Sequence, residues 1–191
     1  MKCILCESFS PNIICSSCQQ NHLQPKLYRD RVGDVEVISF YEYDDIKELL
    51  YAKYHQFGSS ILKILAKNSL GVAKEEFANL RGSYIIAIDD SVASGYSHTS
   101  ILAHSFASPK LKQLHNVLRA TNSVKYAGHN LDYKIANPRE FVYNGKSKID
   151  VILVDDVVTD GVTINEAKRV LVQNGVNLLF CLALSYSKGE R

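Results

Sequence analysis

The chain has 191 residues, of which 46% are hydrophobic and 22% are charged. This composition excludes a largely disordered protein, and no apolar run approaches the ~20 residues that a membrane-spanning helix needs. The formal net charge of only +2 shows no strong overall bias toward nucleic acid. The first residues form no hydrophobic leader, so we expect a soluble, cytoplasmic protein without membrane insertion.

Four of the five cysteines lie within the first 18 residues, in the pattern Cys3-x2-Cys6-x8-Cys15-x2-Cys18. The two-residue spacers let paired sulfurs face one metal ion, and four thiolates complete the tetrahedral shell that zinc prefers. Disulfides are disfavoured in a cytoplasmic chain. The pattern predicts a structural zinc finger over residues 1–24, because a closed four-thiolate site leaves no position for a catalytic water. Whether this finger also contacts a partner stays open.

The rest of the chain alternates strands and helices. Residues 25–34 are polar and are expected to form a linker before a domain over residues 35–191. Strands are predicted over 35–40, 84–88, 151–154 and 176–184, and helices over 44–57, 61–65, 97–106, 109–118 and 163–173. The apolar stripe of the first helix comprises Ile46, Leu49, Leu50, Tyr54 and Phe57. Residues 119–148 are expected to form a long loop with short strands. The strand–helix–strand order over 151–184 requires a parallel sheet, so the prediction is an α/β domain with helices flanking that sheet.

The run from Val151 to Thr163 combines an apolar strand, two adjacent acids, a glycine turn and the start of a helix. Amides at a helix N-terminus bind phosphate, and the helix dipole favours an anion there. Carboxylates repel a phosphate unless they bind hydroxyls, so a ribose 5-phosphate fits, with its hydroxyls on the two acids. An ordinary turn with solvated acids is the alternative, and Asp160 is expected to face solvent. The candidate binding residues are Asp155, Asp156, Val158, Thr159, Asp160, Gly161, Val162 and Thr163.

This thirteen-residue run resembles, at every position, the phosphoribosyl pyrophosphate (PRPP) loop of type I phosphoribosyltransferases. The resemblance implies that family's fold and the binding of PRPP, with Mg²⁺ as its companion ion. It also implies a second, pyrophosphate-contacting loop, for which Asp89 and Asp90 are the positional candidates. These acids carry no positive charge, so Mg²⁺ has to lie between them and a pyrophosphate. Many purine transferases carry an acid where this chain has Thr159, which disfavours purine salvage.

A four-cysteine finger ahead of such a domain resembles the ComF family of bacterial competence proteins. The family's Tyr-x-Tyr…Lys-Tyr-x-Gly segment and its later Asn…Phe pair are matched by Tyr41, Tyr43, Lys53, Tyr54, Gly58, Asn137 and Phe141. Its Arg-Gly-Phe-Asn-Gln motif reads Ser94-Gly95-Tyr96-Ser97-His98 here, which lacks the arginine, a candidate phosphate contact.

The resemblance implies a role in natural transformation, in which the protein handles incoming single-stranded DNA with a DNA-uptake helicase or an inner-membrane channel component. Residues 91–149 suit this role, because eight basic and two acidic side chains give the segment an excess charge of +6. Basic side chains neutralise phosphates and tyrosines stack on bases, although a solvated basic face with inward tyrosines is the alternative. The expected DNA contacts are Lys110, Lys112, Arg119, Lys125, Lys134, Arg139, Lys146 and Lys148, and the expected stacking residues are Tyr96, Tyr126, Tyr133 and Tyr143. The alternative function is an active Mg²⁺-dependent phosphoribosyltransferase of unknown acceptor, for which no catalytic residue stands out.

Overall fold

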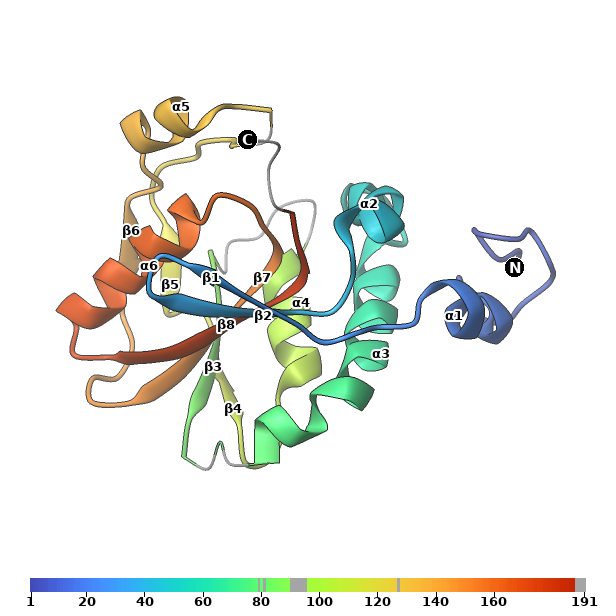
Figure 1. Cartoon of the computed structure of the whole chain (residues 1–191), viewed down its shortest axis with the longest axis horizontal. Helices are drawn as coiled ribbons and strands as arrows, with labels where there is room; N and C mark the ends of the chain where they lie inside the picture. Colours follow the sequence, from blue (N-terminus) through green and yellow to red (C-terminus); the bar gives the residue numbers. More distant parts are fainter. Residues whose placement is uncertain (79, 81, 90–95, 127, 188–191) are drawn as a thin grey trace.

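The computed structural model describes residues 1–78, 80, 82–89, 96–126 and 128–187. Its centre is a six-stranded sheet in the order β1-β2-β8-β7-β3-β4, and every pairing except that of β1 with β2 is parallel (Figure 1). The strands are β1 (Tyr28–Val32), β2 (Val35–Ser39), β3 (Tyr84–Ala87), β4 (Lys112–Leu114), β7 (Asp150–Val158) and β8 (Asn177–Tyr186). The predicted α/β domain with a parallel sheet is confirmed.

Helices cover both faces of this sheet (Figure 1). The first face carries α2 (Tyr43–Tyr51), the 3-10 turn η1 (Ala52–Tyr54), α3 (Gly58–Ala78) and α4 (His98–Phe106). The second face carries α6 (Val162–Gln173) and a two-stranded sheet of β5 (Leu118–Ala120) and β6 (Phe141–Tyr143), with the short helix α5 (Leu131–Ala136) nearby. Alternate residues of the strands feed two separate cores, as the pleat of a strand dictates.

Residues 25–34 were expected to form a linker, but they contain the strand β1. Gly33 adopts a φ of 60° and, with Asp34, closes a tight hairpin that pairs β1 antiparallel to β2. The strand reads Tyr-Arg-Asp-Arg-Val and lies at the edge of the sheet. Charged side chains are common on edge strands, where they discourage pairing with other chains, and here they hide the hydrophobic pattern of a strand.

The helix predicted over residues 109–118 is wrong, and the one predicted over 44–57 is wrong in part. The leucines of 109–118 belong to β4, to β5 and to the turn before β4, in which the Leu111 amide donates to Ser108 Oγ at 3.2 Å. A three-residue strand is too short to show its period, so the leucine spacing imitated a helix. In the first helix, Tyr54 and Phe57 lie beyond the end of α2 and are 57% and 45% exposed. The second helix, α3, is longer than expected, whereas α4 agrees with the predicted helix and is capped by Ser97.

The N-terminal finger packs into the core on the first face of the sheet. Its short helix α1 (Ser16–His22) lies beside the body of the domain at one end of the molecule (Figure 1). Ile13, Ile14 and Leu23 are buried in the same core as Phe40 and Leu62. The finger is therefore joined to the domain by apolar packing as well as by the chain. Among the described residues, none of the helices combines the length and hydropathy that a bilayer crossing requires.

Candidate functional site

The four N-terminal cysteines converge as their spacing predicts. The sulfurs of Cys3, Cys6, Cys15 and Cys18 all lie within 4.8 Å of one another, and those of Cys6 and Cys15 are 3.7 Å apart. Zinc–sulfur bonds of ~2.3 Å in a tetrahedron separate the sulfurs by about 3.8 Å, so the cluster fits zinc. Backbone amides also point at the sulfurs, as that of Cys15 does toward Cys3 Sγ at 3.3 Å. This hydrogen bond is the largest of several that lower the pKa of Cys3 to about 6, which favours the thiolate that a metal needs.

The second site is built around two adjacent acids near the carboxyl end of β7, Asp155 and Asp156. Successive strand residues point to opposite faces of a sheet, and the neighbours of the two carboxyl groups agree with this rule. Asp156 forms an ion pair with Lys53 on the first face. Asp155 is within electrostatic reach of Arg139 and Cys181, which belong to the second face. We call these two residues the acid pair.

Lys53 is the cation nearest to the acid pair. Its ammonium donates to Asp156 Oδ2, and the side chains of Lys53 and Asp156 are only 16% and 13% exposed. Burial alone raises the pKa of Asp156, but the Lys53 charge and hydrogen bond outweigh it and hold this pKa below its usual value. Asp156 is therefore ionised across the physiological range.

Asp155 has no such partner. Burial, followed by repulsion from the Asp156 carboxylate, raises the pKa of Asp155 to about 7. Its Oδ1 accepts only the amide of Asp156, at 2.8 Å, among the hydrogen bonds of the described residues. Two neighbouring acids thus differ strongly in their affinity for a proton, which is typical of functional sites.

Lys53 is held in place by a clamp that joins two segments far apart in the sequence, residues 53–58 and 96–98. The Tyr96 hydroxyl donates to the Lys53 carbonyl, and a Cβ at Gly58 would collide with both of these groups. The His98 ring lies edge-on to the rings of Tyr54 and Tyr96, with centroids 5.3 Å and 4.8 Å away. The site therefore uses the Tyr-Ser-His part of the altered motif, while Ser94 and Gly95 lie outside the described residues.

Arg139 approaches the acid pair from the second face and is fixed by several contacts. Its guanidinium lies 3.4 Å from Asp89 Oδ2 and stacks over the Tyr126 ring at 4.7 Å. Its backbone amide donates to Glu166 Oε2 at 3.0 Å, and Glu166 is buried in α6. Asp89 also accepts the Ala120 amide at 3.0 Å, so its carboxylate is already satisfied by protein groups. The expectation that Asp89 faces Mg²⁺ finds no support in these contacts, and Asp90 lies outside the described residues.

The predicted phosphate loop turns sharply into α6. Gly161 is left-handed, with a φ of 77°, and a Cβ at this position would overlap the side chain of Val32. Thr159 is exposed at the turn, Val158 is buried, and Val162 and Thr163 begin the helix half-buried. The tight approach of β1 explains why the turn requires glycine.

Asp160 is exposed, as expected, but its carboxylate also has partners within the protein. Its Oδ1 accepts the Val162 amide at 3.2 Å, and its Oδ2 accepts the Lys134 ammonium at 2.6 Å. An aspartate two residues before the first helical amide commonly satisfies that amide, and the nearby α5 supplies the counter-charge. The loop therefore carries an internal anion with a cation of its own.

The eight predicted DNA contacts separate into three groups. The prediction is wrong for Lys134 and Arg139, because their ion pairs with Asp160 and Asp89 leave neither side chain free at the surface. Arg119 and Lys125 are exposed. Exposed basic residues at or just before the first residues of β4 and β7 form what we call the basic amino edge, which comprises Lys110, Lys112, Lys146 and Lys148.

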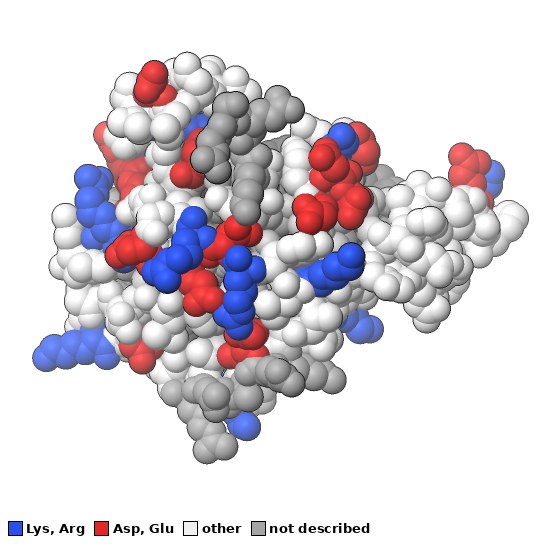
Figure 2. Space-filling view, viewed as in Figure 1, with Lys and Arg blue, Asp and Glu red and all other residues white. Residues whose placement is uncertain are grey.

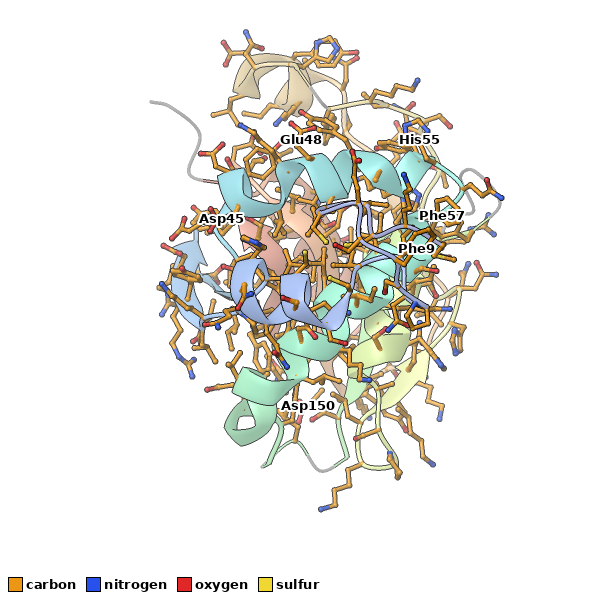
Figure 3. The ribbon with its side chains drawn as sticks, turned by 90° about the vertical axis from the view of Figure 1, so that its right-hand side faces the viewer. Phe9, Asp45, Glu48, His55, Phe57 and Asp150 are labelled. Atoms are coloured by element: carbon orange, nitrogen blue, oxygen red, sulfur yellow. The ribbon has the colours of Figure 1, made fainter. Side chains whose placement is uncertain are left out.

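The basic amino edge borders a surface hollow lined by Gly82, Ser83, Tyr84, Pro109, Lys110 and Lys112. The Lys146 ammonium lies 5.2 Å from the centre of the Tyr84 ring. This edge is the end of the sheet opposite to the acid pair. Figure 3 shows Asp150, the first residue of β7, at one end of the molecule, and His55 and Phe57, which follow the Lys53 turn, toward the other. Figure 2 shows mixed charges over β1 and β2 and few charges on the finger.

The predicted stacking tyrosines are mostly not available at the surface. Tyr126 and Tyr143 are buried, and their hydroxyls donate to backbone carbonyls of Asn137 and Lys146 at 2.9 Å and 2.7 Å. Tyr96 belongs to the Lys53 clamp, and Tyr133, 37% exposed, stacks on His129. The inward alternative thus holds for Tyr126 and Tyr143.

Sequence reasoning did not identify Glu166 or the role of Arg139. Glu166 lies beside the apolar positions Ile164, Ala167 and Leu171 of α6, and an acid at the border of an apolar stripe gives only a weak signal of burial. The sequence drew attention to His98 only because it replaces the last residue of the Arg-Gly-Phe-Asn-Gln motif. The motif that resembles the ComF family includes Lys53, but nothing in the sequence indicated that it pairs with Asp156.

Comparison with solved structures returns phosphoribosyltransferases. An adenine phosphoribosyltransferase is 16% identical, with 91% of each chain covered and a TM-score of 0.46. The adenine phosphoribosyltransferase from Saccharomyces cerevisiae is 16% identical over 90% of this chain and 89% of that chain, with a TM-score of 0.42. The orotate phosphoribosyltransferase from Aeropyrum pernix is 19% identical over 91% and 81%, with a TM-score of 0.40. No family model matches the chain, and the search of curated proteins found no match.

Proposed function

We propose that this protein binds PRPP at the acid pair and the loop that follows it. The observation that carries the proposal is the acid pair at the carboxyl end of a central parallel strand, next to a left-handed glycine that opens α6. Ligands of such sheets bind beyond the carboxyl ends of the strands, and a helix N-terminus favours phosphate. The ribose hydroxyls bind Asp155 and Asp156, and residues 158–163 surround the 5-phosphate. Mg²⁺ accompanies the diphosphate.

This PRPP site is tested by isothermal titration calorimetry with PRPP and Mg²⁺. The double variant Asp155→Asn, Asp156→Asn is expected to lower the affinity at least ~100-fold, because each acid supplies a charge-assisted hydrogen bond to a hydroxyl. Asp150→Asn, which changes an exposed acid at the other end of the same strand, is the matched control and should bind normally. Unchanged affinity in the double variant would refute the ribose assignment.

We further propose that the protein is a ComF-type competence protein that handles incoming single-stranded DNA on the cytoplasmic side, beside a DNA-uptake helicase or channel component. The four-cysteine finger over residues 1–24, attached to an α/β domain with a basic amino edge, supports this role. From Asp150 to Asp156 the strand spans roughly 20 Å, so DNA at the basic edge and PRPP at the acid pair occupy separate sites. Transformation of a deletion strain should fail, and wild-type protein should restore it.

DNA binding is tested with the triple variant Lys110→Gln, Lys112→Gln, Lys146→Gln. We expect a loss of about tenfold or more in affinity for single-stranded DNA and a salt slope smaller by about 2, because each phosphate contact contributes ~0.7. The control replaces Lys26, Lys47 and Lys63, which are elsewhere on the surface, by Gln and so changes the net charge equally. Fluorescence anisotropy over a salt series measures both quantities. Equal behaviour of the two variants, or competition by PRPP, would contradict the assignment.

Phosphoribosyl transfer is the second candidate, and the cations on both sides of the acid pair favour it. Such an enzyme joins an acceptor to C1 of the ribose and releases pyrophosphate. Measuring pyrophosphate release with a panel of nucleobases separates turnover from binding alone.

A further inference from the structure

Lys53 reaches the acid pair from the side opposite to the phosphate loop. The loop leads into α6 on the second face of the sheet, whereas η1 lies on the first face, between α2 and α3 (Figure 1). A ribose whose 5-phosphate rests on the loop and whose hydroxyls rest on the acid pair therefore directs its C1 substituent toward the first face. The Lys53 ammonium is the cation that lies there.

The cost of this arrangement argues for a binding role. Removing two charges from water costs free energy that their attraction often fails to repay, so an ion pair this buried is a poor stabilising device. The surrounding structure is nevertheless arranged to hold Lys53. Tyr96 bonds its carbonyl, and Gly58 leaves room for that contact. His98 Nε2 is buried beside the pair and has no hydrogen-bond partner among the described residues.

We propose that Lys53 binds the diphosphate on C1 of the ribose and so selects a ribose 5-phosphate that carries a 1-diphosphate. This inference rests on the proposed PRPP site. When ribose hydroxyls take over Asp156, the Lys53 ammonium turns to the nearest anion, which is the diphosphate. Asp89 supplies no positive charge, and its carboxylate is occupied by Arg139 and the Ala120 amide. Lys53 thus provides the cation that the altered motif lacks.

A comparison of two ligands tests this role, with affinities for PRPP and for ribose 5-phosphate measured by calorimetry at constant Mg²⁺. Lys53→Gln is expected to lower the PRPP affinity at least ~30-fold and the ratio of PRPP to ribose 5-phosphate affinities at least ~10-fold, because only PRPP carries the diphosphate. Lys53→Arg, which keeps the charge, should restore most of that ratio. Lys47→Gln, on the outer surface of α2, is the control and should leave both affinities unchanged.

Each outcome bears on the inference separately. If both affinities fall equally in Lys53→Gln, the residue acts only through Asp156 and the inference is wrong. Unchanged PRPP binding refutes it as well. If wild-type protein binds neither ligand, the PRPP site itself fails. Lys53→Met, an apolar side chain of similar length, replaces the glutamine variant in the same comparison if the latter does not fold.

Discussion

Asp155→Asn is expected to make the protein more stable at pH 8 while weakening its binding of PRPP. The folded-state pKa of Asp155 is about 7, above its ordinary value of 3.8. Folding therefore favours the protonated form, and the folded protein holds a proton between these two values that the unfolded chain has lost. Stability consequently falls as the pH rises from about 4 to about 7, and the full penalty remains at pH 8. Asparagine carries no charge and removes this penalty.

The expected gain at pH 8 is on the order of 2–4 kcal/mol, or roughly 5–10 °C in melting temperature. Urea denaturation at pH 5 and pH 8 measures it, and the variant should show the smaller difference between the two. Asp156, whose pKa is lowered, does not titrate in this window and adds no slope there. Asp150→Asn, which changes an exposed acid at the other end of β7, is the matched control. A variant less stable than wild type at pH 8 would contradict the buried charge on Asp155.

Replacing Cys3 and Cys6 by Ser is expected to abolish zinc binding and unfold residues 1–24. Structural zinc contributes ~10–16 kcal/mol in small fingers, far more than the few apolar residues of this segment supply. Because Ile14 and Leu23 pack into the first-face core, we also expect the α/β domain to lose about 1–3 kcal/mol without unfolding. Zinc content should fall from one ion per chain to none.

Hydrogen exchange measures where the structure is lost in this double variant. Amides of residues 1–24 should lose protection, and those of β7 and β8 should keep theirs. Cys181→Ala is the matched control, because Cys181 is buried in the second-face core and lies outside the cluster. Retained zinc in the serine variant would contradict the assignment of the zinc ligands. Loss of protection in β7 would show that the α/β domain does not stay folded without the finger.

Features that depend on residues close together in the chain could be predicted from the sequence, and features that depend on distant residues could not. The cysteine cluster and the β7–loop–α6 unit depend on residues close in the chain, and both patterns were informative. The edge strand β1 and the short strand β4 depend on pairing partners far away, and their own residues show no strand period. The periodicity of a short segment carries no information about strand partners that are far away in the chain.

The charged residues follow the same rule. Lys134 and Arg139 looked like surface cations because their acidic partners, Asp160 and Asp89, lie 26 and 50 positions away. Net charge per segment counts such groups as free, although each is neutralised across the fold. Once these pairs are removed, the basic amino edge and the exposed Arg119 and Lys125 remain as the basic groups of the +6 segment.

The internal anion in the phosphate loop has a consequence for selectivity. Asp160 already occupies the Val162 amide and is neutralised by Lys134. A phosphate bound at this loop as proposed would therefore displace a carboxylate that is covalently tethered and cannot diffuse away. Free inorganic phosphate contacts only this loop, so we expect it to compete poorly with the Asp160 carboxylate. If the site binds PRPP as proposed, this ligand also engages the acid pair and Lys53, and we expect the loop to admit a phosphate only together with its sugar.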